Sequence, residues 1–217
     1  MRFTRTLPLM AAALLAGACG SAEEAPEAAE APAEAALTAA EVTAAVEGLE
    51  CFLNNSTMAE AAERPSPLHQ EPIVLGRDVG KVCYGAPAAR DREIMGGLVP
   101  FGELWRVGAN EATALHVPFA VNVGGLALEA GSYSLFALPG ETEWQFFVSP
   151  IWERWGVPIT DEVQASALGS FMVTPATSDE MVEVLQYSWE ASGPDAGTLT
   201  LAWENTRLPI PVSKPVM

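Results

Sequence analysis

The sequence predicts an all-β domain, folded as an antiparallel β-sandwich or an irregular barrel, behind one N-terminal helix and a disordered tether. From about residue 71, short runs rich in Val, Leu, Phe and Trp alternate with Gly, Pro, Asn and Asp about every eight to twelve residues. In the last third, Leu199, Leu201 and Trp203 alternate with polar neighbours, as in a strand with one wet face. Gly124-Gly125 indicates a tight hairpin turn, because glycine accepts the positive φ that such a turn needs.

The pattern of apolar runs and turn residues sets the expected strands. Short turns between them indicate antiparallel pairing rather than βαβ units. We expect strands over residues 73–75, 79–84, 113–117, 120–123, 131–138, 144–149, 171–174, 181–190, 198–203 and 207–211.

Residues 1–18 form a secretory signal, in which Arg2 and Arg5 precede an apolar run and three small residues. The run is shorter than the roughly 20 apolar residues of a membrane-spanning helix. Cys19, directly after the small residues, resembles the lipobox cysteine of bacterial lipoproteins, which is acylated, although Ala16 stands where leucine is usual. Cleavage by the ordinary signal peptidase, which would release a soluble protein, is the alternative.

Four segments follow from composition: the signal peptide 1–18, the lipidated cysteine and acidic tether 19–36, a helical segment 37–63, and the β-rich domain 64–217. Thr38 followed by Glu41 is a capping box, and apolar residues then recur at helical spacing to about Cys51. Residues 54–63 are ambiguous and could hold a helical turn.

The tether is made of Ala, Glu and Pro without a basic residue, so it cannot bury enough apolar surface to offset the entropy of ordering. Gly20, rather than aspartate, follows Cys19, which resembles lipoproteins sorted to an outer membrane. We therefore expect an exported protein, lipid-anchored through Cys19 at the periplasmic face of the outer membrane.

The formal net charge of −17 restricts the possible partners. Removal of the signal takes away two bases and no acid, so the mature chain is more acidic still. Such a field repels nucleic acids and anionic bilayer surfaces and favours solubility. The lipid on Cys19 is the expected contact with the membrane, and nucleic acid is excluded as a partner.

Two further cysteines, Cys51 and Cys83, are candidates for a disulfide, because exported proteins fold in an oxidising compartment. Two buried thiols are the alternative.

Several runs beyond residue 64 resemble a bacterial family of domains of unknown function, numbered 2911, that is often found on exported proteins. The residues that carry the resemblance are Arg64-Pro65-Ser66-Pro67, Val82-Cys83-Tyr84-Gly85 with Pro87, Gly96 to Gly102, Trp105 to Thr113, Gly131 to Phe136 with Pro139, Trp144, and Leu199-x-Leu201-x-Trp203-Glu204. The family implies no reaction. Its members typically carry Ser-Arg-Pro after the tyrosine that matches Tyr84, whereas this chain has Gly85-Ala86-Pro87.

The segment from Trp105 to Thr113 gathers the candidate ligand-binding residues in a loop that enters a strand. Arg106 can bind a carboxylate or phosphate through bidentate hydrogen bonds. Asn110 can orient a polar ligand, and Glu111 can act as a base. Trp105 belongs to the same segment, and Tyr84 joins the cluster if the neighbouring strands align. The alternative is a purely structural corner in which Arg106 pairs with Glu111.

Other chemistry finds little support. His69 and His116 are the two histidines, so a three-histidine zinc site is excluded, and we expect neither a metal nor a cofactor. His116 alternates with apolar residues and is expected to be a polar surface residue. No Gly-x-Ser-x-Gly elbow or Gly-x-Gly-x-x-Gly loop is present. Trp152 and Trp155 are expected to pack in the core or to plug a loop, and an exposed aromatic platform for a sugar or a partner is the alternative.

These observations favour a noncatalytic binding or interaction module, tethered by lipid to the envelope, that presents the corner to a small anionic ligand or a protein. Whether the protein is an enzyme is left open. The first alternative is a periplasmic hydrolase that uses Glu111 as a general base and Arg106 to hold the substrate. The second is a purely structural envelope domain.

Overall fold

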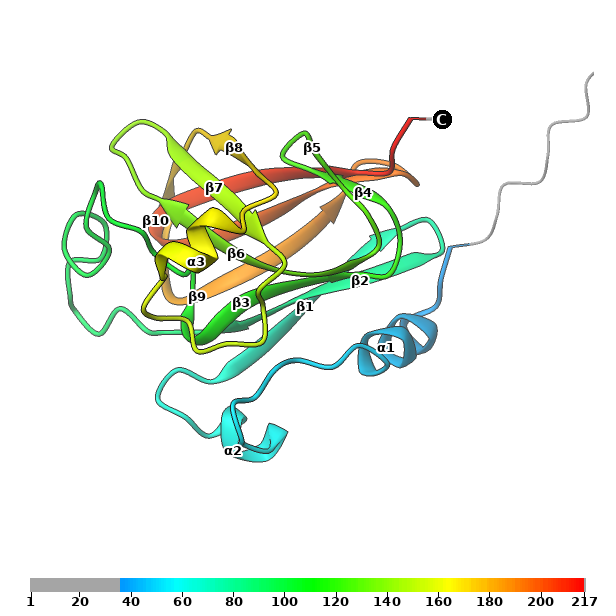
Figure 1. Ribbon diagram of the computed structural model, residues 1–217, viewed down its shortest axis with the longest axis horizontal. Helices are drawn as coiled ribbons and strands as arrows, with labels where there is room; N and C mark the ends of the chain where they lie inside the picture. Colours follow the sequence, from blue (N-terminus) through cyan, green and yellow to red (C-terminus); the bar gives the residue numbers. More distant parts are fainter. Residues whose placement is uncertain (1–35, 217) are drawn as a thin grey trace, which may run out of the picture. The chain divides into compact units, whose positions relative to one another are not determined.

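The computed structural model describes residues 36–216, in which ten β-strands and three short helices form (Figure 1). The expected signal peptide, Cys19 and all but the last residue of the tether lie outside the described residues. The helices are α1 (Ala39–Glu47), α2 (Met58–Ala62) and α3 (Asp161–Ala165). The strands are β1 (Leu68–Leu75), β2 (Asp78–Gly85), β3 (Ala109–Val117), β4 (Val121–Val123), β5 (Leu126–Leu128), β6 (Gly131–Leu138), β7 (Trp144–Ser149), β8 (Gly169–Val173), β9 (Ala176–Ala191) and β10 (Ala196–Ser213).

The helices begin at threonine caps. Thr38 and Glu41 form the expected capping box of α1, and Thr57 with Glu60 forms a second box that starts α2 in the segment the sequence left open. Helix α1 ends at Glu47 rather than near Cys51, because Gly48 caps it. Helix α3, capped by Thr160, was not expected, since five residues carry too little periodicity to be recognised. No helix in the described part of the chain is long and apolar enough to cross a membrane.

The strands form two antiparallel sheets, which confirms the expected β-sandwich. The six-stranded sheet has the order β1-β2-β3-β6-β7-β8, and the four-stranded sheet has the order β5-β4-β10-β9 (Figure 1). Gly124 and Gly125, both at positive φ, form the expected two-residue turn between β4 and β5.

Two expected strands of the tail are one continuous strand, β10. The sequence predicts a break between residues 203 and 207, but the structure has a bulge there, with Glu204 at a positive φ of 47°. A bulge bends a strand without ending it. As a result, β10 pairs with β9 as far as Arg207 and with β4 at Val212 and Ser213.

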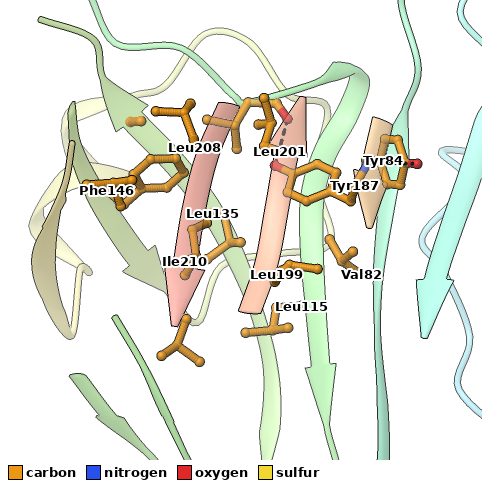
Figure 2. Packing of buried hydrophobic residues seen from close by; sticks show 14 of the residues in the cluster. Val82, Tyr84, Leu115, Leu135, Phe146, Tyr187, Leu199, Leu201, Leu208 and Ile210 are labelled. Carbon is orange, nitrogen blue, oxygen red and sulfur yellow. Dashed lines mark hydrogen bonds between the residues drawn. The ribbon is translucent and has the colours of Figure 1, made fainter. Parts of the chain in front are cut away.

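The hydrophobic core lies between the two sheets (Figure 2). Val82, Tyr84, Leu115, Leu135 and Phe146 come from the six-stranded sheet, and Tyr187, Leu199, Leu201, Leu208 and Ile210 come from the four-stranded sheet. The alternation of Leu199, Leu201 and Trp203 therefore points these side chains inward, as the sequence predicts.

The outer face of the six-stranded sheet is also buried over β2, β3 and β6, and it carries polar side chains there. Lys81, His116 and Ser134 occupy the positions that alternate with the core residues of β2, β3 and β6. His116 is 3% exposed, which corrects the expected surface position; its Nδ1 lies 2.8 Å from the Ser132 hydroxyl and its ring meets Trp152 edge-on. This face must therefore be covered by other parts of the chain.

The N-terminal strap, defined here as residues 48–67, forms part of that cover and is fastened to the sheet. Cys51 is joined to Cys83 of β2 by a disulfide, at a sequence separation of 32 residues. In the chain-entropy account a loop of that length adds roughly 3 to 4 kcal/mol of stability. Just before the strap, the carbonyl of Val46 accepts a hydrogen bond from the Lys81 ammonium.

Candidate functional site

The corner between residues 105 and 113 is held in an unusual backbone conformation. Trp105 exchanges two backbone hydrogen bonds with Ala137, and β3 starts at Ala109. Val107, at φ 48° just before β3, and Asn110, at φ 62° in its second position, lie in the left-handed region, which costs a β-branched residue most. The Val107 carbonyl accepts hydrogen bonds from the hydroxyls of Thr113 and Tyr187, so the core beneath fixes this conformation.

Glu111 is held by Arg64 of the strap, not by Arg106, so the ion pair expected from the sequence is wrong. Nη1 of Arg64 donates to Oε1 and Oε2 of Glu111 at 2.9 and 2.8 Å, and Nη2 donates to the Ser56 hydroxyl at 2.7 Å. The Glu111 side chain is 4% exposed. A carboxylate whose two oxygens both accept from a guanidinium is poorly placed to take a proton from a substrate, so the geometry does not favour a hydrolase.

Asn110 adds a second fastening for the strap. Its Nδ2 donates to the backbone carbonyl of Ser66 at 2.7 Å. Asn110 and Glu111, which are adjacent in the corner, therefore bind Ser66 and Arg64, which are two residues apart in the strap. This is a structural task, and it accounts for an amide and a carboxylate at these positions.

Tyr84 and Trp105 belong to the core. The Tyr84 hydroxyl accepts a hydrogen bond from the backbone N–H of Tyr187, and burial raises its pKa. Trp105 stacks on Trp203 and meets Trp144 edge-on, with ring centres 6.0 and 5.8 Å apart. The Tyr84 hydroxyl is therefore occupied within the core, and Trp105 packs against that core.

Arg106 is the candidate residue whose guanidinium charge is not paired with a carboxylate of the described residues. Its side chain crosses directly over Gly156, where a Cβ would collide with Cδ of the arginine. Its Nε is buried without a hydrogen-bond partner, and burial lowers the pKa of the guanidinium. No ion pair involves Arg106 within residues 36–216.

Arg154 borders the same glycine and was not identified from the sequence. The loop after β7 brings it there: Ala112 N–H donates to the Arg154 carbonyl and Gly156 N–H donates to the Asn110 carbonyl. Arg154 Nη1 donates to the carbonyls of Trp155 and Gly156, while Nη2 is buried without a partner. Burial lowers its pKa as well, and no carboxylate of the described residues forms an ion pair with it.

The candidate functional site is formed by two half-buried arginine side chains that both lie against Gly156, Arg106 through its Cδ and Arg154 through its Nη1. Each has one buried guanidinium N–H without a hydrogen-bond partner. The neighbouring Trp155 is 41% exposed and reaches solvent more than Trp152, the other tryptophan of the alternative aromatic platform. Guanidinium groups bind carboxylates and phosphates through paired hydrogen bonds, and partial burial strengthens this attraction. Among the described residues no cluster of His, Cys, Asp or Glu could hold a metal ion.

Comparison with known proteins gives one match. A family model described as "Protein of unknown function (DUF2911)" matches residues 67–212. No curated protein and no solved structure matches the chain. The matched region begins one residue before β1 and includes Arg106, Glu111 and Arg154, whereas Arg64 and Cys51 lie ahead of it.

Proposed function

The chain belongs to the DUF2911 family of proteins of unknown function, and we propose that it is a binding module of the cell envelope that takes a small anion between Arg106 and Arg154. The observation that carries this proposal is that Arg106 and Arg154 each have one buried guanidinium nitrogen without a hydrogen-bond partner and no paired carboxylate. The chain has 28 acidic side chains for 11 basic ones. Partial burial of two cationic side chains against the same glycine, with no carboxylate paired to either, is costly unless an anion is bound for part of the time.

The ligand is small because of the charge of the whole protein. A net charge of −17 repels extended polyanions, but a single carboxylate or phosphate group feels the nearby guanidinium charges more than the distant acids. Arg106 and Arg154 supply the charge, and exposed Trp155 adds an apolar surface beside them. A sugar or other small molecule that carries one such group fits this chemistry.

Substitution of either arginine should weaken the binding of a small anion about tenfold or more, because a hydrogen bond to a charged group contributes roughly 1.5 to 3 kcal/mol. Inorganic phosphate and glucuronate are titrated calorimetrically into the wild type, Arg106→Met and Arg154→Met at neutral pH and low salt. Arg92→Met is the matched control, because Arg92 hydrogen-bonds to the carbonyls of Ala88 and Ala89 in another loop. An absence of binding to the wild type, or an equal loss in the control, would reject the site and favour a purely structural domain.

The location in the envelope is a separate part of the proposal. It is supported by the signal-like residues 1–18, by Cys19 directly after them and by the acidic tether. We expect the native host to acylate Cys19 and to hold the protein at the periplasmic face of the outer membrane.

The lipid anchor predicts that Cys19→Ser removes the protein from the membrane fraction. Intact-mass spectrometry of the wild type from its native host should show a diacylated or triacylated N-terminus at residue 19, and membranes should retain the protein after a salt wash. A soluble protein with an unmodified thiol would show instead that the ordinary signal peptidase processes it.

A further inference from the structure

A pocket of about 610 Å³ lies where the end of α1 and the strap meet the outer face of the six-stranded sheet. Pockets of a few hundred Å³ or more are the usual size for small-molecule sites. The apolar part of its lining comes from Leu49, Phe52, Leu53 and Met58, together with Trp152 of the loop after β7. None of the candidate residues of the corner lines it, so it is independent of the anion site.

The base of the pocket holds a buried cation. Lys81 is 2% exposed, and its Nζ donates to Oε1 of Gln70 at 2.6 Å and to the Val46 carbonyl at 3.0 Å. Burial lowers the pKa of this ammonium group, an effect that Glu50 partly offsets. An ammonium group carries three N–H bonds, and these two contacts use two of them. The third can donate to an acceptor oxygen of a ligand, since Lys81 lines the pocket.

The rim of the pocket is acidic. Glu47, Glu50 and Glu153 line it and are exposed, and none of them forms an ion pair in the described part of the chain. Three carboxylates against one ammonium give the pocket a negative field, which the net charge of the protein reinforces. The indole of Trp152, next to Glu153, can also attract a cation to its face.

The strap that lines the pocket is fastened at two points along its sequence. The disulfide joins Cys51 to Cys83, and Arg64 pairs with Glu111. A preformed site binds without the entropic cost of ordering its own walls.

We propose that this pocket binds an amphipathic amine: a molecule with an apolar body along the wall, an acceptor oxygen at Lys81 and a cationic nitrogen at the acidic rim. The apolar lining favours an apolar body, and the remaining N–H of Lys81 can donate to the acceptor oxygen. The acidic rim favours a positively charged head group.

Two probes with the same lauroyl chain, one an ester and one an amide, test the sign of the head group. Lauroylcholine carries a quaternary ammonium and lauroylglycine carries a carboxylate. Both are titrated below their micelle concentrations, with tryptophan fluorescence and calorimetry as readouts. We expect lauroylcholine to bind at least about tenfold more tightly to the full mature chain, because the rim attracts the cation and repels the carboxylate. Equal affinities, tighter binding of lauroylglycine, or no binding of either would overturn the proposal.

Variants locate the binding. Glu50→Gln and Glu153→Gln should each weaken lauroylcholine several-fold, whereas Glu129→Gln, an exposed acid in the turn before β6, should leave it unchanged. Lys81→Met should also weaken lauroylcholine by removing the donor to its carbonyl. Leu53→Trp, which fills the pocket, should abolish binding without loss of the anion bound at Arg106. If the two rim variants match Glu129→Gln, the amine binds elsewhere and the assignment fails.

Discussion

Replacement of Glu111 by glutamine is expected to lower the free energy of unfolding by about 3 kcal/mol. The change leaves the Arg64 guanidinium, 20% exposed, without its counter-charge, and removal of one partner of a buried pair typically costs roughly 3 to 5 kcal/mol. We place the expected loss at the lower end because water still reaches part of Arg64. Urea unfolding followed by tryptophan fluorescence measures the change.

Two further variants separate the ion pair from other effects. In the double variant Arg64→Met with Glu111→Gln no unpaired charge remains, so much of the lost stability should return. Asp78→Asn, which removes one acid from the exposed contacts of Lys214, should change stability by less than about 1 kcal/mol. If Glu111→Gln is as mild as Asp78→Asn, the strap is not held by this pair.

Acidification from pH 7 to pH 5 is expected to remove about 2 kcal/mol of stability through His116 alone. Burial, and to a lesser extent the charge of Lys81, lowers the pKa of His116 from 6.5 to about 4. The folded protein therefore keeps this ring neutral at pH 5, whereas the unfolded chain takes up a proton below 6.5. As the pH is lowered, stability falls over the range in which the unfolded state binds more protons than the folded state. For His116 this range lies between about pH 6.5 and pH 4.

The contribution of His116 is isolated by comparison of two histidine variants. His116→Gln should flatten the fall in stability between pH 7 and pH 5, even if the variant is less stable throughout. His69→Gln, which replaces an exposed histidine of β1, should keep the slope of the wild type. The same slope in both variants would mean that His116 is protonated freely in the folded protein.

The sandwich was predictable because its strands have one face toward the core. Leu199, Leu201 and Trp203 alternate with polar residues, and the structure buries all three. The burial predictions fail where a strand has both of its faces covered. His116 also alternates with apolar residues, but the strap and the loop after β7 cover its side of the sheet. The sequence of a single strand cannot predict that residues from elsewhere in the chain will cover its second face.

The corner shows the same limit for the site. Sequence analysis grouped Arg106, Asn110 and Glu111 because they are neighbours, but the partner of Glu111 is Arg64, 47 residues away. Arg154 escaped notice because an isolated arginine in a loop carries no pattern. Its role depends on backbone hydrogen bonds of residues 154–156 to Asn110 and Ala112, which no local motif encodes.

The proposed function depends on Arg106 and Arg154 forming one anion site, and the Nε–Hε signals of the arginines test this most directly. In a proton–nitrogen NMR spectrum of the labelled protein, loss of one signal in Arg106→Lys assigns Arg106. Addition of phosphate should move the Arg106 signal to saturation, while that of Arg92, whose Nε donates to Ala89, stays in place. An Arg106 signal that does not move, or that only follows Arg92, would contradict the anion site.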